Sequence, residues 1–146
     1  MAKEIERTFL VDDDSFRYMA VHTVHIIQGY LNRDPERTVR VRVLNDSAFL
    51  TVKGKTEGCV RDEFEYEVPL EDGLKMLDLC SGRILNKTRY LVPFEGYTWE
   101  VDEYHGDLEG LIVTEVEMKD AKAQITLPPF AGREVTGDPR YYNSQL

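Results

Sequence analysis

Cysteine and histidine are scarce in this sequence of 146 residues, which contains two and three of them respectively. Cys59 and Cys80 form no C-x-x-C pair, so we expect reduced, structural thiols in a cytoplasmic protein. His22, His25 and His105 show no finger-like spacing that could complete a zinc site with these cysteines. The sequence therefore predicts no zinc centre.

Basic residues are outnumbered, since 18 Lys and Arg stand against 27 Asp and Glu, for a net charge of −9. Such an excess of negative charge argues against a nucleic-acid backbone or an anionic membrane as the main partner. An anionic small ligand stays possible, because local charge decides its binding. Long apolar runs are also missing, so we expect neither a secretory signal at Met1–Glu4 nor a membrane span.

Alternating strands are what the sequence does contain, and its 42% hydrophobic residues suffice for one core in a single domain, residues 1–146. Strands are predicted over residues 3–11, 21–30, 37–44, 48–54, 59–68, 84–92, 97–104 and 111–118. Helical segments are predicted over residues 16–20, about 70–80, 121–123 and 138–143. The predicted fold is mainly β (α+β), a closed eight-stranded antiparallel β-barrel with a few short helices on the outside and at the C-terminus.

Charged residues recur two positions apart on nearly every predicted strand. Side chains of equal parity share one face of a strand, so Glu4 and Glu6 point the same way while Ile5 and Phe9 take the opposite face. The acidic pairs are Glu4/Glu6, Glu63/Glu65, Glu100/Asp102 and Glu115/Glu117, and the basic groups are Arg40/Arg42, Lys87/Arg89 and the single Lys53.

Two interpretations of these charged faces are open. They could form the solvated outer face of a β-sandwich, which is common for any one strand. However, same-sign pairs repel, and their repetition calls for counter-ions or a bound ligand. If the faces line a lumen, carboxylates suit Mg²⁺ or Mn²⁺, and Arg and Lys suit a polyphosphate or nucleoside triphosphate. A lipocalin-like barrel for apolar ligands would instead require a greasy lumen.

Several motifs, in order along essentially the whole chain, resemble the CYTH superfamily, also called triphosphate tunnel metalloenzymes. They are Glu4-x-Glu6, Arg40-Val41-Arg42, Thr51-Val52-Lys53-Gly54, Glu63-Phe64-Glu65, Lys87-Thr88-Arg89-Tyr90, Trp99-Glu100-Val101-Asp102, Glu115-Val116-Glu117 and the tail 134–143. The resemblance implies a tunnel that hydrolyses a triphosphate with Mg²⁺ or Mn²⁺. Short bacterial members are typically inorganic tripolyphosphatases, which release pyrophosphate and phosphate, and a homodimer is common.

The resemblance also implies roles for individual residues. Glu4, Glu6, Glu115 and Glu117 look like metal ligands, with Glu63 a weaker candidate. Glu65 and Asp102 look like supports for a second metal or for the attacking water. The triphosphate clamp would be Arg40, Arg42, Lys53, Lys87 and Arg89, with Arg133 added from the tail.

One position departs from the family pattern. The first motif of the family is Glu-x-Glu-x-Lys, and Thr8 occupies the position of the lysine, with the same parity as Glu4 and Glu6. One charge-assisted contact, worth about 1.5–3 kcal/mol, is then missing from the lumen. Two alternatives therefore stay open: an enzyme of the same fold for thiamine triphosphate, a nucleoside triphosphate or ATP cyclisation, and a module that binds polyphosphate or nucleotides without turnover.

Overall fold

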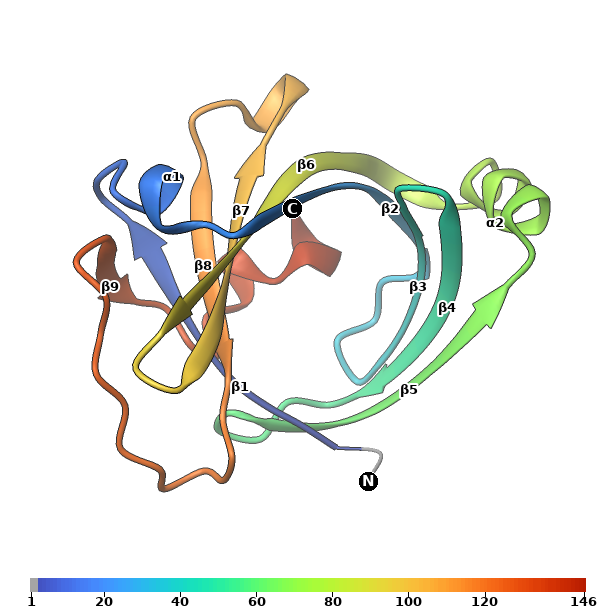
Figure 1. Ribbon diagram of the computed structural model, residues 1–146. Coiled ribbons are helices and arrows are strands. Elements are labelled where there is room, and N and C mark those ends of the chain that lie inside the picture. The colour runs from blue at the N-terminus through green and yellow to red at the C-terminus, as the bar shows by residue number, and fades with distance from the viewer. Residues whose placement is uncertain (1–2) are drawn as a thin grey trace.

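The computed structural model describes residues 3–146, and its strands encircle a common axis (Figure 1). Met1 and Ala2, part of the stretch expected to carry no signal sequence, lie outside the described residues. The strands are β1 (Lys3–Val11), β2 (His22–Asn32), β3 (Arg37–Leu44), β4 (Ser47–Gly54), β5 (Val60–Val68), β6 (Ser81–Phe94), β7 (Tyr97–Tyr104), β8 (Ile112–Glu117) and β9 (Ala131–Glu134). The helices are α1 (Phe16–Met19) and α2 (Leu70–Leu77), with 3₁₀ turns at Gly106–Leu108, Pro139–Tyr141 and Asn143–Gln145.

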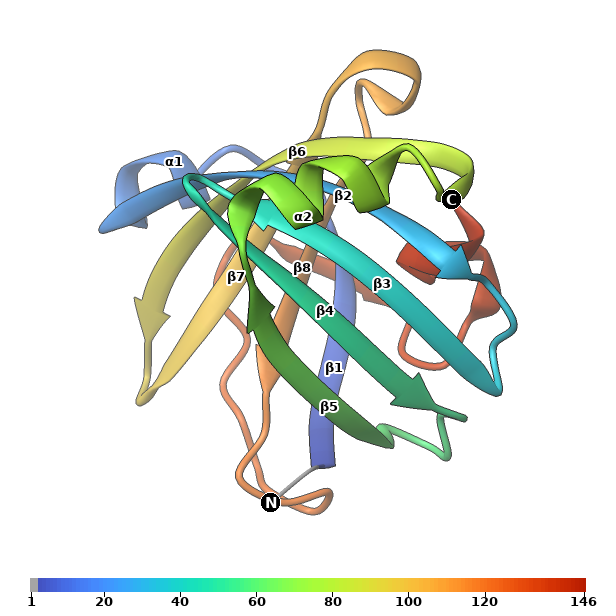
Figure 2. The ribbon, with the colours of Figure 1, turned by 90° about the vertical axis from the view of Figure 1, so that its right-hand side faces the viewer.

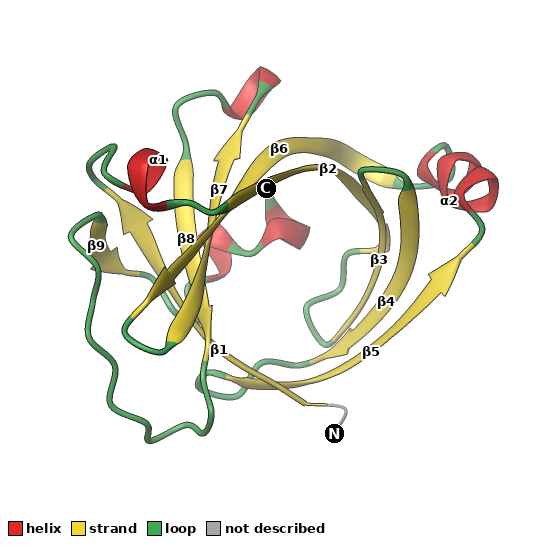
Figure 3. Cartoon of the chain, in the orientation of Figure 1, coloured by secondary structure: helices red, strands yellow, loops and turns green. Residues whose placement is uncertain are grey.

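The predicted closed, eight-stranded antiparallel barrel is confirmed. Its strand order is β5-β4-β3-β2-β6-β7-β8-β1, and Lys3–Ile5 of β1 pair with Val60–Asp62 of β5 to close the ring. Figure 3 shows the strands following one another around this ring. In a closed barrel, alternate side chains of every strand point inward, so the parity of the charged pairs decides what lines the interior.

A ninth strand, β9, was not predicted from the sequence. It pairs with Phe9 and Val11 of β1, on the edge that β5 leaves free beyond Ile5. β9 has four residues and follows Pro128-Pro129, so it carries too little alternation to be recognised locally. The position of β9 depends on the free backbone edge of β1, which is far away in the sequence.

Three predicted helical segments differ from the structure. The C-terminal helix is replaced by two 3₁₀ turns, because Tyr142 between them has an extended backbone (φ −67°, ψ 130°). Residues 121–123 form only a turn, closed by a hydrogen bond from the Ala123 N–H to the Asp120 carbonyl. The last regular helical residue of α2 is Leu77 rather than Cys80.

The apolar faces of the strands point outward and are covered in two places. On β1, β6, β7 and β8 the outer side chains form a cluster with Phe16 of α1 and Phe130 of the 118–130 loop. Trp99 belongs to this cluster and is completely buried, on the face of β7 opposite to Glu100. Across the barrel, α2 packs on β3 and β4 (Figure 2). With the apolar surface on the outside, the charged faces are left for the interior.

The residue through which α2 approaches the barrel is a glycine rather than a leucine. Leu74 is half-exposed, and Leu79, beyond the helix, is largely exposed. Gly73 is the buried residue, and a Cβ there would overlap with the Ala48 side chain on β4. Only glycine therefore allows α2 to lie this close to the sheet.

Candidate functional site

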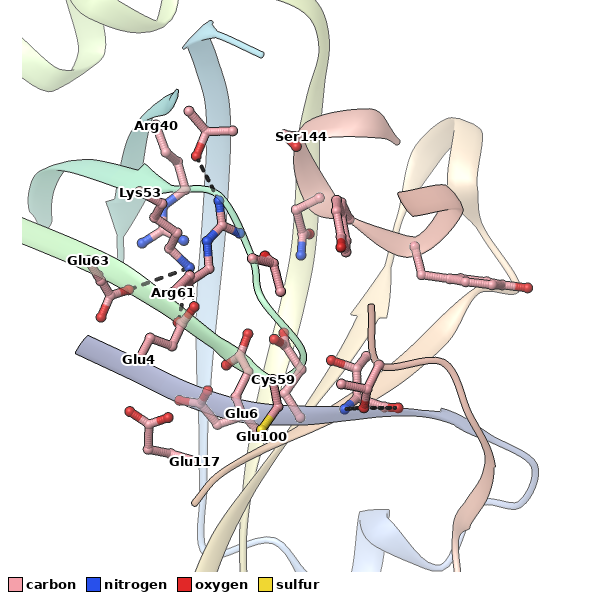
Figure 4. A pocket seen from close by; sticks show the side chains of 18 of the residues that line it. Glu4, Glu6, Arg40, Lys53, Cys59, Arg61, Glu63, Glu100, Glu117 and Ser144 are labelled. Atoms are coloured by element: carbon pink, nitrogen blue, oxygen red, sulfur yellow. Dashed lines mark hydrogen bonds and ion pairs between the residues drawn. The ribbon is translucent and has the colours of Figure 1, made fainter. Parts of the chain in front are cut away.

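A cavity of about 380 Å³ lies inside the barrel and is lined mainly by charged and polar side chains (Figure 4). Among residues 3–146, its carboxylates are Glu4, Glu6, Glu63, Glu65, Glu100, Glu115 and Glu117, and its cations are Arg40, Arg42, Lys53, Arg61 and Arg89. The cavity that these described residues form therefore lacks the apolar lining that a barrel for apolar ligands would require.

Strand register explains why the carboxylates meet. β1 pairs with β8 so that Glu6 lies opposite Glu117 and Thr8 opposite Glu115, and β7 places Glu100 opposite Glu115. Residues directly opposite each other in an antiparallel pair project to the same face. Carboxylates from three strands therefore form one acidic wall of the cavity, which consists of Glu4, Glu6, Glu100, Glu115 and Glu117.

Like charges in this wall perturb one another. Burial and the neighbouring Glu115 carboxylate raise the pKa of Glu6 well above its ordinary value. Burial and the Glu4 carboxylate raise the pKa of Glu117 to about 7. Lys53 partly compensates the cluster, since its Nζ lies 3.0 Å from Glu4 Oε2 and 3.4 Å from Glu63 Oε2 (Figure 4). The carboxylates of the wall still outnumber the cations that pair with them.

The donor chemistry of this wall fits a hard divalent cation. Its ligands would all be carboxylate oxygens, as Mg²⁺ and Mn²⁺ prefer. Among residues 3–146, no three His, Cys, Asp or Glu side chains converge on a single ion-sized point. A cation at Glu4 would compete with Lys53, which already pairs with this carboxylate.

Two cations of the predicted clamp, Arg40 and Arg42, lie on β3 and line the same cavity. Arg40 Nη2 donates to Glu65 Oε1 at 3.1 Å, and Arg42 Nε donates to Gln28 Oε1 at 3.0 Å. Burial and the neighbouring Arg40 and Arg89 lower the pKa of Arg42 to about 9. A polyanion would relieve the repulsion among these guanidinium groups.

Lys87 and Asp102 lie in the wall behind the cavity rather than on its surface. Lys87 Nζ is 2.7 Å from Asp102 Oδ2, and Arg89 donates to both Asp102 oxygens at 2.8 and 3.0 Å. Lys87 is 0% exposed and Asp102 2%. Burial lowers the pKa of Lys87 to about 8. Burial alone would raise the pKa of Asp102, but Arg89 and Lys87 hold it well below its usual range.

The structure thus separates the residues predicted for the site into three groups. Those facing the cavity are Glu4, Glu6, Glu63, Glu65, Glu115, Glu117, Arg40, Arg42, Lys53 and Arg89. Lys87 and Asp102 support them from behind. Arg133 does not line the cavity: it is exposed on β9, outside the barrel ring, and its Nη2 reaches only Tyr141 Oη at 3.4 Å. The predicted addition of Arg133 to the clamp is therefore not supported by its position.

Sequence reasoning missed two contributions to the cavity. Arg61 has the same parity as Glu63 and Glu65, so the spacing used for the other pairs could have revealed it. The second is the polar lining from the C-terminal tail, supplied by Thr136, Tyr141, Tyr142, Asn143 and Ser144, among other residues. The resemblance pointed to the tail, but only Arg133 was expected to contribute from it, because the positions of the other side chains depend on distant partners.

The tail is tied to the barrel by specific hydrogen bonds. Asn143 Oδ1 accepts from Lys87 Nζ at 3.2 Å and from Tyr104 Oη at 2.6 Å. Arg33 Nε donates to the Ser144 carbonyl at 2.6 Å. At the other end of the tail, Thr136 Oγ1 accepts from the Thr8 N–H at 2.9 Å, and both threonines line the cavity.

Comparison with known proteins adds an independent line of evidence. The CYTH domain family matches residues 2–142. An inorganic triphosphatase of Acetivibrio thermocellus is 47% identical, covering 100% of this chain and 94% of that protein. An inorganic triphosphatase of Nitrosomonas europaea is 35% identical over 98% of this chain and 95% of its own length. The crystal structure of the inorganic triphosphatase NE1496 aligns with a TM-score of 0.66 at 33% identity, covering 97% of this chain and 95% of that one.

Proposed function

The chain belongs to the CYTH domain family, and from this premise we propose that it is an enzyme that hydrolyses inorganic tripolyphosphate to pyrophosphate and phosphate. The observation that carries the proposal is one cavity that, among residues 3–146, is lined by seven carboxylates together with four arginines and a lysine. Relatives that match nearly the full chain are named inorganic triphosphatases, which supports the inorganic substrate.

Triphosphatases of this family are metal-dependent in general. We propose Mg²⁺ or Mn²⁺ as the ion, with Glu4, Glu6, Glu115 and Glu117 as its ligands and Glu63 as an additional one. The all-oxygen donor set supports this choice. When bound, such an ion neutralises charge on phosphate oxygens and polarises the phosphoryl group.

The remaining roles follow from where the side chains lie. Arg40, Arg42, Lys53 and Arg89 would bind the phosphate oxygens, since guanidinium forks match them in geometry. Glu65 faces the cavity and accepts from Thr51 Oγ1 at 2.9 Å, so it is suited to orient the attacking water. Asp102 is already engaged by Lys87 and Arg89, so it would act by positioning Arg89.

Other expectations from the sequence stay proposals. A cytoplasmic location is suggested by the two free cysteines. A homodimer, the absence of a nucleic-acid partner and the extent of a single domain over residues 1–146 likewise stay predictions. No helix among residues 3–146 has the length and apolar character to cross a bilayer.

Phosphate release is the direct test of the function. The purified protein should release phosphate from tripolyphosphate with Mg²⁺ or Mn²⁺, and more slowly from pyrophosphate, ATP and thiamine triphosphate. Glu6→Gln and Glu115→Gln should each lower kcat/KM roughly 100-fold or more, because each removes a charge from the acidic wall. The matched control is Glu67→Gln, an exposed glutamate of β5 outside the cavity, which should behave like the parent.

The possible outcomes separate the alternatives. Faster turnover of ATP or thiamine triphosphate would identify an organic triphosphatase of the same fold, and cyclic AMP formed from ATP would identify a cyclase. Tripolyphosphate binding in a calorimeter without any phosphate release would identify a binding module and would refute the hydrolase proposal.

A further inference from the structure

The cations of the cavity differ in whether a carboxylate already neutralises them. Arg40 pairs with Glu65, Lys53 with Glu4 and Glu63, and Arg89 with Asp102 and Glu100. Among residues 3–146, neither Arg42 nor Arg61 has a carboxylate oxygen within 4.0 Å of its guanidinium nitrogens. These two arginines are therefore the cavity cations whose charge is free for a ligand.

Among the described residues, 3–146, the hydrogen-bond partners of Arg61 are neutral groups. Its Nε donates to the Gly54 carbonyl at 3.1 Å, and its Nη2 donates to Thr38 Oγ1 at 3.3 Å. Thr38 is itself buried, with 3% of its surface exposed. A guanidinium has five N–H donors, so three remain for a ligand after these two bonds. These two hydrogen bonds orient the Arg61 side chain and leave most of its donors free.

Within the described part of the chain, Arg61 forms no ion pair although its position in the sheet is next to a carboxylate. In the β1–β5 pairing Arg61 lies directly opposite Glu4, the nearest carboxylate by register. Nevertheless Glu4 is bound by Lys53 from β4, and Arg61 points past it into the cavity (Figure 4). An arginine beside an acidic wall that forms no ion pair is available for an anion.

We propose that Arg61 is a further substrate-binding residue, which contacts phosphate oxygens of the triphosphate and supplies the lumenal cation that Thr8 does not provide. The inference rests on the proposed function, since it assumes that the cavity takes a triphosphate. Arg61 and Thr8 line the same cavity, so Arg61 on β5 adds a positive charge to a lumen in which Thr8 on β1 is neutral.

Neutralising Arg61 while keeping a hydrogen-bonding side chain tests the proposal. Arg61→Gln should weaken tripolyphosphate binding, measured by calorimetry, and raise KM by roughly 10- to 100-fold, as expected for one charge-assisted contact. kcat should change far less, because a contact made equally in the ground state and the transition state alters mainly KM. Arg61→Lys should recover most of the affinity. Arg37→Met, on the exposed start of β3, is the control and should bind like the parent.

A purely structural role for Arg61 would give a different result. It would lower the melting temperature of Arg61→Gln and leave the affinity of the folded protein unchanged, which would overturn the proposal. If Arg61→Gln does not fold, the parent protein can be tested directly. Tripolyphosphate should shift the Nη–H signals of the Arg61 guanidinium in an NMR spectrum, and unmoved signals would overturn the inference. Absence of phosphate release by the parent would instead refute the proposed function, irrespective of Arg61.

Discussion

At the scale of single residues, the interior depends on charges that compensate each other across strands. Asp102 shows this most clearly, since it is buried with Lys87 on one side and Arg89 on the other. A buried charge that loses its partner costs several kcal/mol, whereas the intact group is tolerated. Asp102 therefore fixes the direction of Arg89 at the cavity wall.

Asp102→Asn should destabilise the protein by about 3–5 kcal/mol at pH 7, because two buried cations lose their counter-charge. The pKa of Asp102 is lower in the folded state than in the unfolded state. Its contribution is therefore fully present above about pH 4 and is lost as the pH falls through the folded value. Urea unfolding measures this effect: the free energy of unfolding of the parent should exceed that of Asp102→Asn by less at pH 3 than at pH 7.

The control for this prediction is Asp46→Asn in the exposed turn between β3 and β4, where Asn is equally acceptable. It should leave the free energy of unfolding within about 0.5 kcal/mol of the parent. Equal stabilities of parent and Asp102→Asn at pH 7 would show that the Lys87–Asp102–Arg89 group does not stabilise the fold.

At the scale of elements, two contacts determine how the barrel is closed and covered. β1 pairs with β8 along one edge and is shared along the other between β5 and β9. α2 lies against β3 and β4 through Gly73, where the helix and sheet backbones approach closely. Neither contact can be inferred from the residue types of β1 or α2 alone, because each depends on which element lies next to it.

Gly73→Ala separates helix propensity from packing. Propensity alone predicts a gain of about 1 kcal/mol, since alanine is the better helix former. The structure predicts a loss of about 1–3 kcal/mol instead, because the new methyl would overlap with Ala48 and force α2 away from the sheet. Chemical denaturation measures the sign directly.

A second substitution checks the cause of this loss. Ala48→Gly removes the methyl that the new side chain would meet, so the double variant should be more stable than Gly73→Ala alone. A double variant that is less stable would show that the overlap is not the origin of the effect.

At the scale of the whole molecule, the charge is unevenly placed: the chain carries −9, and seven of its acidic side chains line one cavity. These carboxylates repel one another, as the raised pKa values of Glu6 and Glu117 indicate. A protein that binds a divalent cation here should therefore be more stable with the ion than without it.

Mg²⁺ or Mn²⁺ at about 100 times its dissociation constant should stabilise the fold by about 2.7 kcal/mol. For a chain of this size that corresponds to a rise in melting temperature of roughly 5–10 °C. EDTA should reverse the rise, and Glu6→Gln should reduce it. NaCl at matched ionic strength is the control, and an equal rise with NaCl would indicate general screening in place of a specific ion.

Much of the interior could be predicted from the sequence because strand parity is a local property. Residues two apart share a face wherever the chain is extended, so Glu4, Glu6, Arg40, Arg42, Glu115 and Glu117 were expected on one side of their strands, and the structure places them in one cavity. The same rule would have included Arg61. The alternation also indicated the eight barrel strands.

Only the tertiary structure decided which charges meet. The pairing of Lys53 with Glu4, the burial of Lys87 and Asp102 behind the wall, the exposure of Arg133, the added strand β9 and the tail that lines the cavity all depend on register and closure between distant segments. Local periodicity states which face a side chain takes, but the partner across the barrel is set by how all strands close together. The sequence by itself thus determined an interior of acidic and basic side chains. The closed barrel decided which cavity cations form no ion pair within residues 3–146, namely Arg42 and Arg61.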